Sequence, residues 1–299
     1  MELTEAVRRF LEDCELAQGL SERTVANYQH YLERFALFAD GTPVERIDDE
    51  LVRRWRLDLN RNEALGRATQ NYHLVALRAF LAWLARHNIA SLASDKIELP
   101  GVDEPEVSFL QSEAVEKLLS MPDQATDTGK RDKAVLETLF STGLRVAELV
   151  RLDRGDVEGR EEVSVLGKGK KRRVVFLSPS AQAAITSYLK TRVDADPALF
   201  IRERVGEDAD NRLTVRTIQR ILKHYAALAG VAEHVTPHTL RHSFATDLLR
   251  SGADLRSVQA LLGHSSVVTT QRYTHLTDTH LKEVHQAFHG REQRRDLEE

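Results

Sequence analysis

The sequence predicts a mainly α-helical protein that contains one small β-sheet and is built from two domains. Three observations lead to this fold class. The first hundred residues repeat apolar side chains at spacings of three and four with almost no strand signal, as amphipathic helices do. Residues 162–177 hold two β-branched runs around a glycine-rich basic turn, a pattern typical of a hairpin. Between these regions, residues 93–107 lose the periodicity and contain two prolines and a glycine.

Four helices are predicted before this interruption, near residues 3–18, from residue 21, near 48–59 and near 68–87. Ser21 is a good N-cap for the second helix, in which Val25, Tyr28, Leu32 and Phe35 form one apolar stripe. Four helices of this length form a compact bundle. We therefore assign residues 1–92 to a helical domain and residues 93–107 to a linker.

The remainder of the chain is mixed. Helical patterns begin at Ser112, cover residues 130–140, and resume after Gly143. Beyond the hairpin, further helices are predicted over 180–192, 215–229, 237–251 and 254–262, and around Tyr273. We assign residues 108–290 to one mixed α/β domain and expect residues 291–299 to form a flexible tail.

Composition is ordinary for a soluble globular protein, and the sequence implies no export. The chain is 41% hydrophobic, and no apolar run approaches the roughly 20 residues that a membrane span needs. The first ten residues carry charges at helical spacing and lack the pattern of a signal peptide. Cys14 is the single cysteine, so no internal disulfide is possible, and we expect it to be a small buried residue.

The charge of the chain argues against a nucleic-acid partner at first sight, because its net value is −4. Residues 1–107 have a net charge of −6 (13 basic, 19 acidic) and residues 108–299 one of +2 (29 basic, 27 acidic). Phosphate binding depends on local clustering, however, and the turn of the predicted hairpin gathers five cations, Lys168, Lys170, Lys171, Arg172 and Arg173. A charge run is usually a solvated face, but its place in a hairpin turn favours phosphate binding.

His238 and Arg241 are candidate anion-binding residues. Thr236 and Pro237 form a helix-start signal, so the two side chains lie three residues apart near a helix N-terminus, where backbone N–H groups favour anions. His238 and His242 also have the spacing of two zinc ligands. We expect no metal site, because Thr239 stands where a metalloprotease has glutamate and Arg241 would place a cation beside the metal.

Three more residues are candidates for a functional site. Gly263 has the position of a C-cap, which places His264 in a loop, and Arg145 follows the helix break at Gly143. Tyr273 follows four β-branched residues, 267–270, which form helix weakly. Taken alone, Tyr273 would be an amphipathic ring at the edge of a core.

Together these side chains fit phosphoryl transfer. Two arginines bind the non-bridging oxygens of a phosphate by charge-assisted hydrogen bonds. A tyrosine with a pKa of about 10 is only about one part in a thousand phenolate at pH 7, so it needs nearby positive charge or a base. The arginines and histidines supply both, and a lysine can protonate the departing alkoxide.

The set resembles the tyrosine recombinase (phage integrase) family, most closely its Xer branch. Its signature is present in order in the segments TGLRVAEL, LGKGK, HTLRHSFAT, LLGHS and TQRYTH, which contain Arg145, Lys168, His238, Arg241, His264 and Tyr273. The resemblance implies a SAM-like, four-helix core-binding domain followed by the tyrosine recombinase catalytic domain. It also implies that residues 281–288 dock into a neighbouring protomer.

The resemblance further implies transesterification without metal or cofactor. Tyr273 would attack a DNA phosphate to give a 3′-phosphotyrosyl bond and a free 5′-hydroxyl, which then reverses the reaction on the partner duplex. Arg145, Arg241 and His264 would stabilise the pentacoordinate phosphate, while His238 would assist proton movement at the tyrosine. Lys168 would protonate the 5′ oxygen, although Lys170 and Lys171 lie in the same turn.

The implied partners are double-stranded DNA at a short, nearly palindromic site and further recombinase subunits, of this chain or a paralogue, in a tetramer on two duplexes. The implied role is the resolution of chromosome dimers, with activation by a cell-division protein. A length of 299 residues is expected to leave no room for the additional arm-binding domain of larger phage integrases, which favours the Xer branch. Two alternatives keep the chemistry: a mobile-element integrase and a type IB topoisomerase. A third is a DNA-binding protein on an inactive recombinase scaffold.

Overall fold

The computed structural model describes residues 1–17, 19–61, 65–99, 101, 109–167, 172–202, 211–232 and 234–263. The chain divides into two compact units, 1–105 and 106–299. The described residues are mainly helical and include one two-stranded sheet, which confirms the predicted fold class. Within this described part, the helices are all too short or too polar to cross a membrane.

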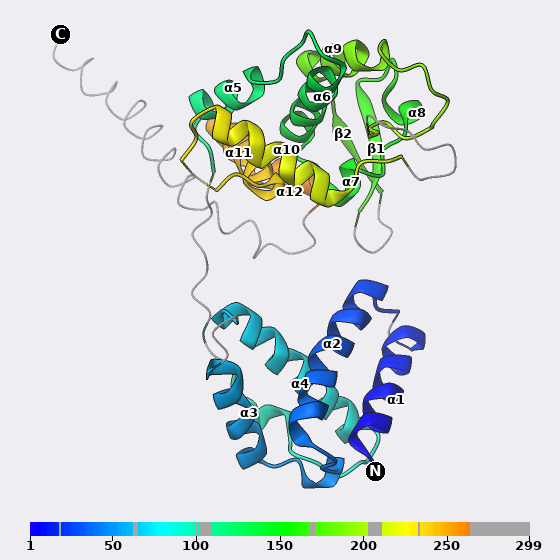
Figure 1. The fold of residues 1–299 in the computed structure, drawn as a ribbon, viewed down its shortest axis with the longest axis vertical. Coiled ribbons are helices and arrows are strands. Elements are labelled where there is room, and N and C mark those ends of the chain that lie inside the picture. The colour runs from blue at the N-terminus through cyan, green and yellow to red at the C-terminus, as the bar shows by residue number, and fades with distance from the viewer. Residues whose placement is uncertain are drawn as a thin grey trace, which may run out of the picture. The chain divides into compact units, whose positions relative to one another are not determined.

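The first unit is a helical bundle (Figure 1). Its four α-helices, all predicted from the sequence, are α1 (Leu3–Leu16), α2 (Glu22–Ala39), α3 (Asp49–Arg61) and α4 (Arg67–Arg86). Helix α2 begins where predicted, because the Ser21 hydroxyl accepts a hydrogen bond from the Thr24 N–H. Two short 3-10 helices, η1 (Val44–Arg46) and η2 (Ser94–Lys96), complete the unit.

The core of the first unit is formed by large side chains that face inward from all four helices. The most deeply buried include Phe10, Leu32, Phe35, Trp55 and Phe80. Cys14 is fully buried among them, as predicted, and is therefore a small core residue. Ile97, which falls in the predicted linker, is also buried in this core.

The second unit contains eight helices among its described residues. They are α5 (Ser112–Ser120), α6 (Asp127–Thr142), α7 (Val146–Leu149), α8 (Arg154–Val157), α9 (Pro179–Leu189), α10 (Val215–Leu228), α11 (Pro237–Arg250) and α12 (Leu255–Leu262). Helix α6 begins three residues earlier than predicted, because the Thr126 hydroxyl accepts a hydrogen bond from the Gly129 N–H. The helix predicted around Tyr273 lies outside the described residues.

The predicted hairpin is present as strands β1 (Glu162–Leu166) and β2 (Arg172–Phe176), which pair antiparallel. Its inner face carries buried valines at positions 163, 165 and 175. Arg173 pairs with Val165 and so belongs to this inner face, whereas Arg172 is exposed. The side chains of the two neighbouring arginines therefore enter different environments.

Helix α6 packs against α9 and α11 at the centre of the second unit (Figure 1). It ends at Gly143, whose φ of 58° is in the left-handed region. A Cβ atom at this position would lie 2.4 Å from Cδ1 of Phe244 on α11, so the close approach of chain and helix requires glycine. This contact holds Gly143, two residues before Arg145, against α11.

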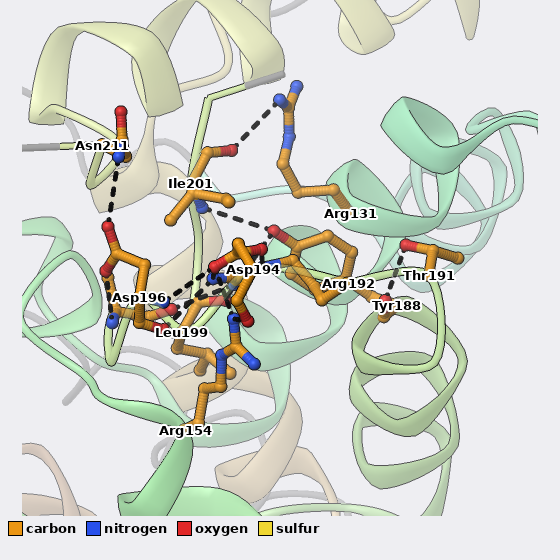
Figure 2. Close-up of polar contacts among 11 residues, drawn as sticks. Arg131, Arg154, Tyr188, Thr191, Arg192, Asp194, Asp196, Leu199, Ile201 and Asn211 are labelled. Carbon is orange, nitrogen blue, oxygen red and sulfur yellow. Dashed lines mark hydrogen bonds and ion pairs between the residues drawn. The ribbon is translucent and has the colours of Figure 1, made fainter. Parts of the chain in front are cut away.

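A polar network joins the segment after α9 to α8 (Figure 2). Arg192, whose side chain is only 4% exposed, donates through Nε and Nη2 to Asp194, at 2.5 Å each. Its Nη1 donates to the carbonyls of Ala198 and Leu199, at 3.0 Å each, and Arg154 on α8 donates to Asp194 at 2.6 Å. The Arg192 guanidinium holds the pKa of Asp194 well below its usual range, so this carboxylate stays ionised.

Replacing Arg192 by methionine is expected to lower the free energy of unfolding of the second unit by about 3 kcal/mol, since it leaves the Ala198 and Leu199 carbonyls without this donor and removes one of the two arginines that bind Asp194. Urea unfolding of the whole chain followed by circular dichroism measures the change. Both tryptophans, Trp55 and Trp83, lie in the first unit, so tryptophan fluorescence reports that unit separately.

The matched control is Val193→Ala, because Val193 stands between Arg192 and Asp194 in sequence and is fully exposed. It should change the unfolding free energy by less than about 0.5 kcal/mol. Equal unfolding midpoints for Arg192→Met and Val193→Ala would show that the network does not stabilise the unit.

Candidate active site

Arg241 lies in the first turns of α11, which begins as predicted: the Thr236 hydroxyl accepts a hydrogen bond from the Thr239 N–H, and Pro237 occupies the first helical position. The side chain of Arg241 is buried, with 3% of the residue exposed. Its Nη1 donates to the Gly143 carbonyl at 2.5 Å and its Nη2 to the Leu262 carbonyl at 2.6 Å. Arg241 therefore joins the end of α6 to the end of α12.

Arg145 is the N-cap residue of α7 and reaches the same place from another direction. Its Nη2 donates to the Gly263 carbonyl at 3.4 Å, next to the carbonyl that Arg241 binds. The Arg145 side chain is 38% exposed. The structure thus brings the two arginines predicted to bind phosphate together at the end of α12, one buried and one accessible.

The end of α12 is closed by Gly263, whose φ of 64° gives the left-handed C-cap that the sequence predicts. A third arginine binds here, because Nε of Arg173 donates to the Leu261 carbonyl at 3.0 Å. Helix C-termini carry unpaired carbonyls and partial negative charge, which guanidinium groups satisfy. Three consecutive carbonyls, of Leu261, Leu262 and Gly263, each have an arginine donor.

Glu148 on α7 connects two of these arginines. Its carboxylate accepts bonds of 2.9 and 2.7 Å from Nη1 and Nη2 of Arg173, and bonds of 2.8 and 3.1 Å from the backbone N–H and Nη1 of Arg145. Burial alone would raise the pKa of Glu148, but the bonds from Arg173 and Arg145 outweigh it and lower the pKa to about 2. Glu148 is therefore a carboxylate at neutral pH.

Two residues of this site differ from what the sequence predicts. Glu148 is absent from the predicted set, although it stands three residues after the N-cap Arg145, which is the spacing of a capping box and could have indicated it. Arg173 belongs to the predicted cationic cluster of the hairpin turn, but its side chain is only 10% exposed and points to Glu148. The alternation of β2 places Arg173 on the face of Val175 and is the sequence signal for this correction.

His238 is exposed at the start of α11. Its ring contacts the ring of His242 edge to face, with centroids 4.2 Å apart and planes at 74°, and His242 is buried. Among the residues that the structure describes, no group of three His, Cys, Asp or Glu side chains has the arrangement of a metal site.

Lys168, His264 and Tyr273 lie outside the described residues, and so do Lys170 and Lys171. In sequence, Lys168 stands between β1 and β2, and His264 directly follows Gly263.

The described part of the site carries an excess of positive charge. Arg145, Arg173 and Arg241 converge on the end of α12, and Glu148 neutralises one of the three. Counted over these four side chains alone, the charge is about +2 in a chain of net charge −4, which suits an anion that carries negative charge on several oxygens. Among the three arginines, Arg145 has the most exposed side chain.

Comparison with known proteins gives consistent matches. Residues 108–280 match the family model described as phage integrase family, and residues 7–88 match phage integrase, N-terminal SAM-like domain. The chain is 35% identical to tyrosine recombinase XerC of Pelobacter propionicus over 99% of both chains. It is 36% identical to tyrosine recombinase XerD of Listeria innocua over 97% of this chain and 100% of that protein.

Among solved structures, the fold is similar to that of XerH site-specific recombinase bound to its palindromic difH substrate in a post-cleavage complex. The two chains are 21% identical, the TM-score is 0.72, and the alignment covers 94% of this chain and 84% of the other.

The pKa of Glu148 predicts a pH-dependent contribution to stability. Because the folded-state pKa of about 2 is below the ordinary 4.5, the contribution is present above pH 4.5 and is lost as pH falls toward 2. The shift corresponds to roughly 3 kcal/mol. Urea unfolding of wild type and Glu148→Gln from pH 7 to pH 3 should show the largest difference at pH 7 and a shrinking one below 4.5.

Glu50→Gln provides the control, because Glu50 forms an exposed ion pair with Arg53 on α3. Water and salt screen such pairs, so its removal should change stability little at any pH. A Glu148→Gln variant that behaves like Glu50→Gln would contradict the assigned interaction.

Proposed function

The chain belongs to the phage integrase family and is a tyrosine site-specific recombinase of the Xer type, and from this premise we propose that Tyr273 is its nucleophile for DNA cleavage. The observation that supports this most strongly is the convergence of Arg145 and Arg241 on neighbouring carbonyls at the end of α12. Two guanidinium groups so close together provide donors for the non-bridging oxygens of one phosphate.

In the proposed reaction, the Tyr273 hydroxyl oxygen bonds to a backbone phosphorus while the bond from phosphorus to the 5′ oxygen breaks. Arg145, Arg241 and His264 stabilise the charge on the pentacoordinate phosphate. Lys168 gives a proton to the departing 5′ oxygen, and His238 assists removal of the tyrosine proton. The products are a 3′-phosphotyrosyl enzyme and a free 5′-hydroxyl.

Rejoining reverses these steps with the 5′-hydroxyl of the partner duplex. One phosphodiester is exchanged for a phosphotyrosine and then for another phosphodiester, so the bond energy is conserved. The proposed cycle therefore needs neither a nucleotide nor a metal ion. The role of each residue is to bind, orient or exchange a proton at a fixed phosphate.

We also propose that four subunits, of this chain or of this chain with a paralogue, act on two duplexes at a short, nearly palindromic site. The similar XerH structure contains a palindromic substrate, which supports this type of target. The proposed biological role is resolution of chromosome dimers in the cytoplasm, with a cell-division protein as activator. The Xer relatives that match over nearly the whole chain support this role.

The first unit has a surface suited to DNA in spite of its acidic composition. Helix α4 contains no acidic residue and three arginines, Arg67, Arg78 and Arg86. On α2, Arg23, Asn27, His30 and Arg34 follow at spacings of four, three and four, so they share one side of the helix. Tyr31 of α2 stacks on Tyr72 of α4, with ring centroids 6.5 Å apart, so the two helices adjoin. We propose that this α2/α4 face binds the duplex.

Purified wild-type protein, given a duplex nicked near the cleavage point, is expected to form a covalent adduct that survives SDS. Tyr273→Phe should form none while it still binds the same DNA, because the phenolic oxygen alone is missing. Denaturing gel electrophoresis of labelled DNA measures the adduct, and a mobility shift measures binding. The control is Tyr28→Phe, in the first unit, which should form adduct normally; an adduct with Tyr273→Phe would identify another nucleophile.

The charged face predicts a salt-dependent effect on binding. Replacing Arg23 and Arg78, both exposed, with glutamine should weaken binding to specific and random duplexes alike. The slope of log K against log salt should fall by about 1 for each phosphate that an arginine no longer neutralises. Glu33→Gln, on another side of α2, is the control and should not weaken binding. Unchanged salt slopes for the arginine variants would place the DNA elsewhere.

A further inference from the structure

Arg173 is a nearly buried cation of the candidate site that donates three side-chain hydrogen bonds. Its Nη1 and Nη2 bind both oxygens of Glu148, at 2.9 and 2.7 Å, and its Nε binds the Leu261 carbonyl at 3.0 Å. The forked geometry fixes the orientation of a carboxylate as well as its position, which a single ammonium contact does not. With its side chain 10% exposed, Arg173 is poorly placed to bind DNA directly.

The carboxylate that Arg173 orients is also the partner of Arg145. Glu148 accepts the backbone N–H of Arg145 at 2.8 Å and its Nη1 at 3.1 Å. The fork of Arg173 occupies both carboxylate oxygens, so the contact between the side chains of Arg145 and Glu148 is a single bond. Arg145 thus keeps other N–H groups that can bind a phosphate. Because Glu148 is shared with Arg173, it does not fully neutralise the charge of Arg145.

Without Arg173, Glu148 and Arg145 would form an isolated pair. The carboxylate would then be able to take a forked contact with Arg145 and would compete with the phosphate for the same N–H groups. The accessible guanidinium would also lose the fixed partner that sets its direction. The geometry therefore connects a buried arginine of the hairpin to the phosphate-binding arginine through one carboxylate.

We propose that Arg173 is a positioning residue for strand cleavage, which holds Glu148 and, through it, the guanidinium of Arg145 in the arrangement that binds the scissile phosphate. This inference rests on the proposed function, because it concerns the phosphate that Tyr273 attacks. It assigns to Arg173 no contact with DNA and no proton transfer.

The test compares Arg173→Gln and Arg173→Lys with wild type in single-turnover cleavage of the nicked duplex at saturating protein. Arg173→Gln is expected to cleave on the order of 100-fold more slowly, the size of effect typical of one misplaced transition-state interaction. Affinity for the same DNA should change by less than about threefold, because many other phosphate contacts remain. Arg173→Lys keeps the charge but not the fork, so it should restore cleavage only in part.

A double-variant cycle with Glu148→Gln separates positioning from a general structural role. If Arg173 acts through Glu148, adding Arg173→Gln to Glu148→Gln should reduce cleavage little further, because the connection is already broken. If the two losses multiply, Arg173 acts by another route and the proposal is wrong. The thermal unfolding midpoint of each variant is measured in parallel, and Arg173→Lys takes the place of Arg173→Gln in the cycle should the latter fail to fold.

Arg151→Gln is the matched control. Arg151 is an exposed arginine two residues after α7, so its replacement removes the same charge nearby without touching Glu148 through its side chain. Wild-type cleavage by bound Arg173→Gln, or a loss fully accounted for by weaker DNA binding, would overturn the inference while leaving the proposed function intact. Absence of adduct with wild type would instead overturn the proposed function, and this inference with it.

Discussion

The binding of three arginines to the last carbonyls of α12 is the interaction on which the site depends. Arg145, Arg173 and Arg241 come from α7, β2 and α11, and each donates to a different carbonyl among residues 261–263. A helix C-terminus offers several unpaired acceptors within one turn, so it is able to collect donors from distant segments. It thereby fixes the spacing of cations that would otherwise repel one another.

The charges close to a bound anion matter more for its binding than the net charge of the whole chain. The protein has a net charge of −4, yet its acidic residues are absent from α4 and are outnumbered where the three arginines meet. At physiological salt, charges more than about 8 Å apart on a surface are largely screened. A phosphate therefore responds to the guanidinium groups beside it and hardly at all to carboxylates that lie well beyond this distance.

Most of the fold could be predicted from the sequence because its signals are local. Helices begin or end in the structure at four residues where the sequence predicts a helix boundary, namely Ser21, Thr236, Gly143 and Gly263. The hairpin follows from its β-branched runs. The link between Arg173 and Glu148 could not be predicted in this way, because 25 residues separate the two and strand register decides which arginine faces inward. The order of motifs identified the candidate residues, but only the fold shows which arginine is accessible.

Arg145 and Arg241 differ in physical character, although both are assigned to the same phosphate. Arg241 is 3% exposed and donates two short bonds to main-chain carbonyls, so in the proposed reaction it would act as a fixed charge beside the phosphate. Arg145 is 38% exposed and bound more loosely, so it is able to reorient when the phosphate arrives. Charge stabilisation is most effective when the charged groups move little during the reaction. The buried carboxylate of Glu148, which binds Arg145, limits the movement of this arginine. Arg145 thus depends on contacts with neighbouring side chains for a fixed orientation, whereas Arg241 is fixed by its burial.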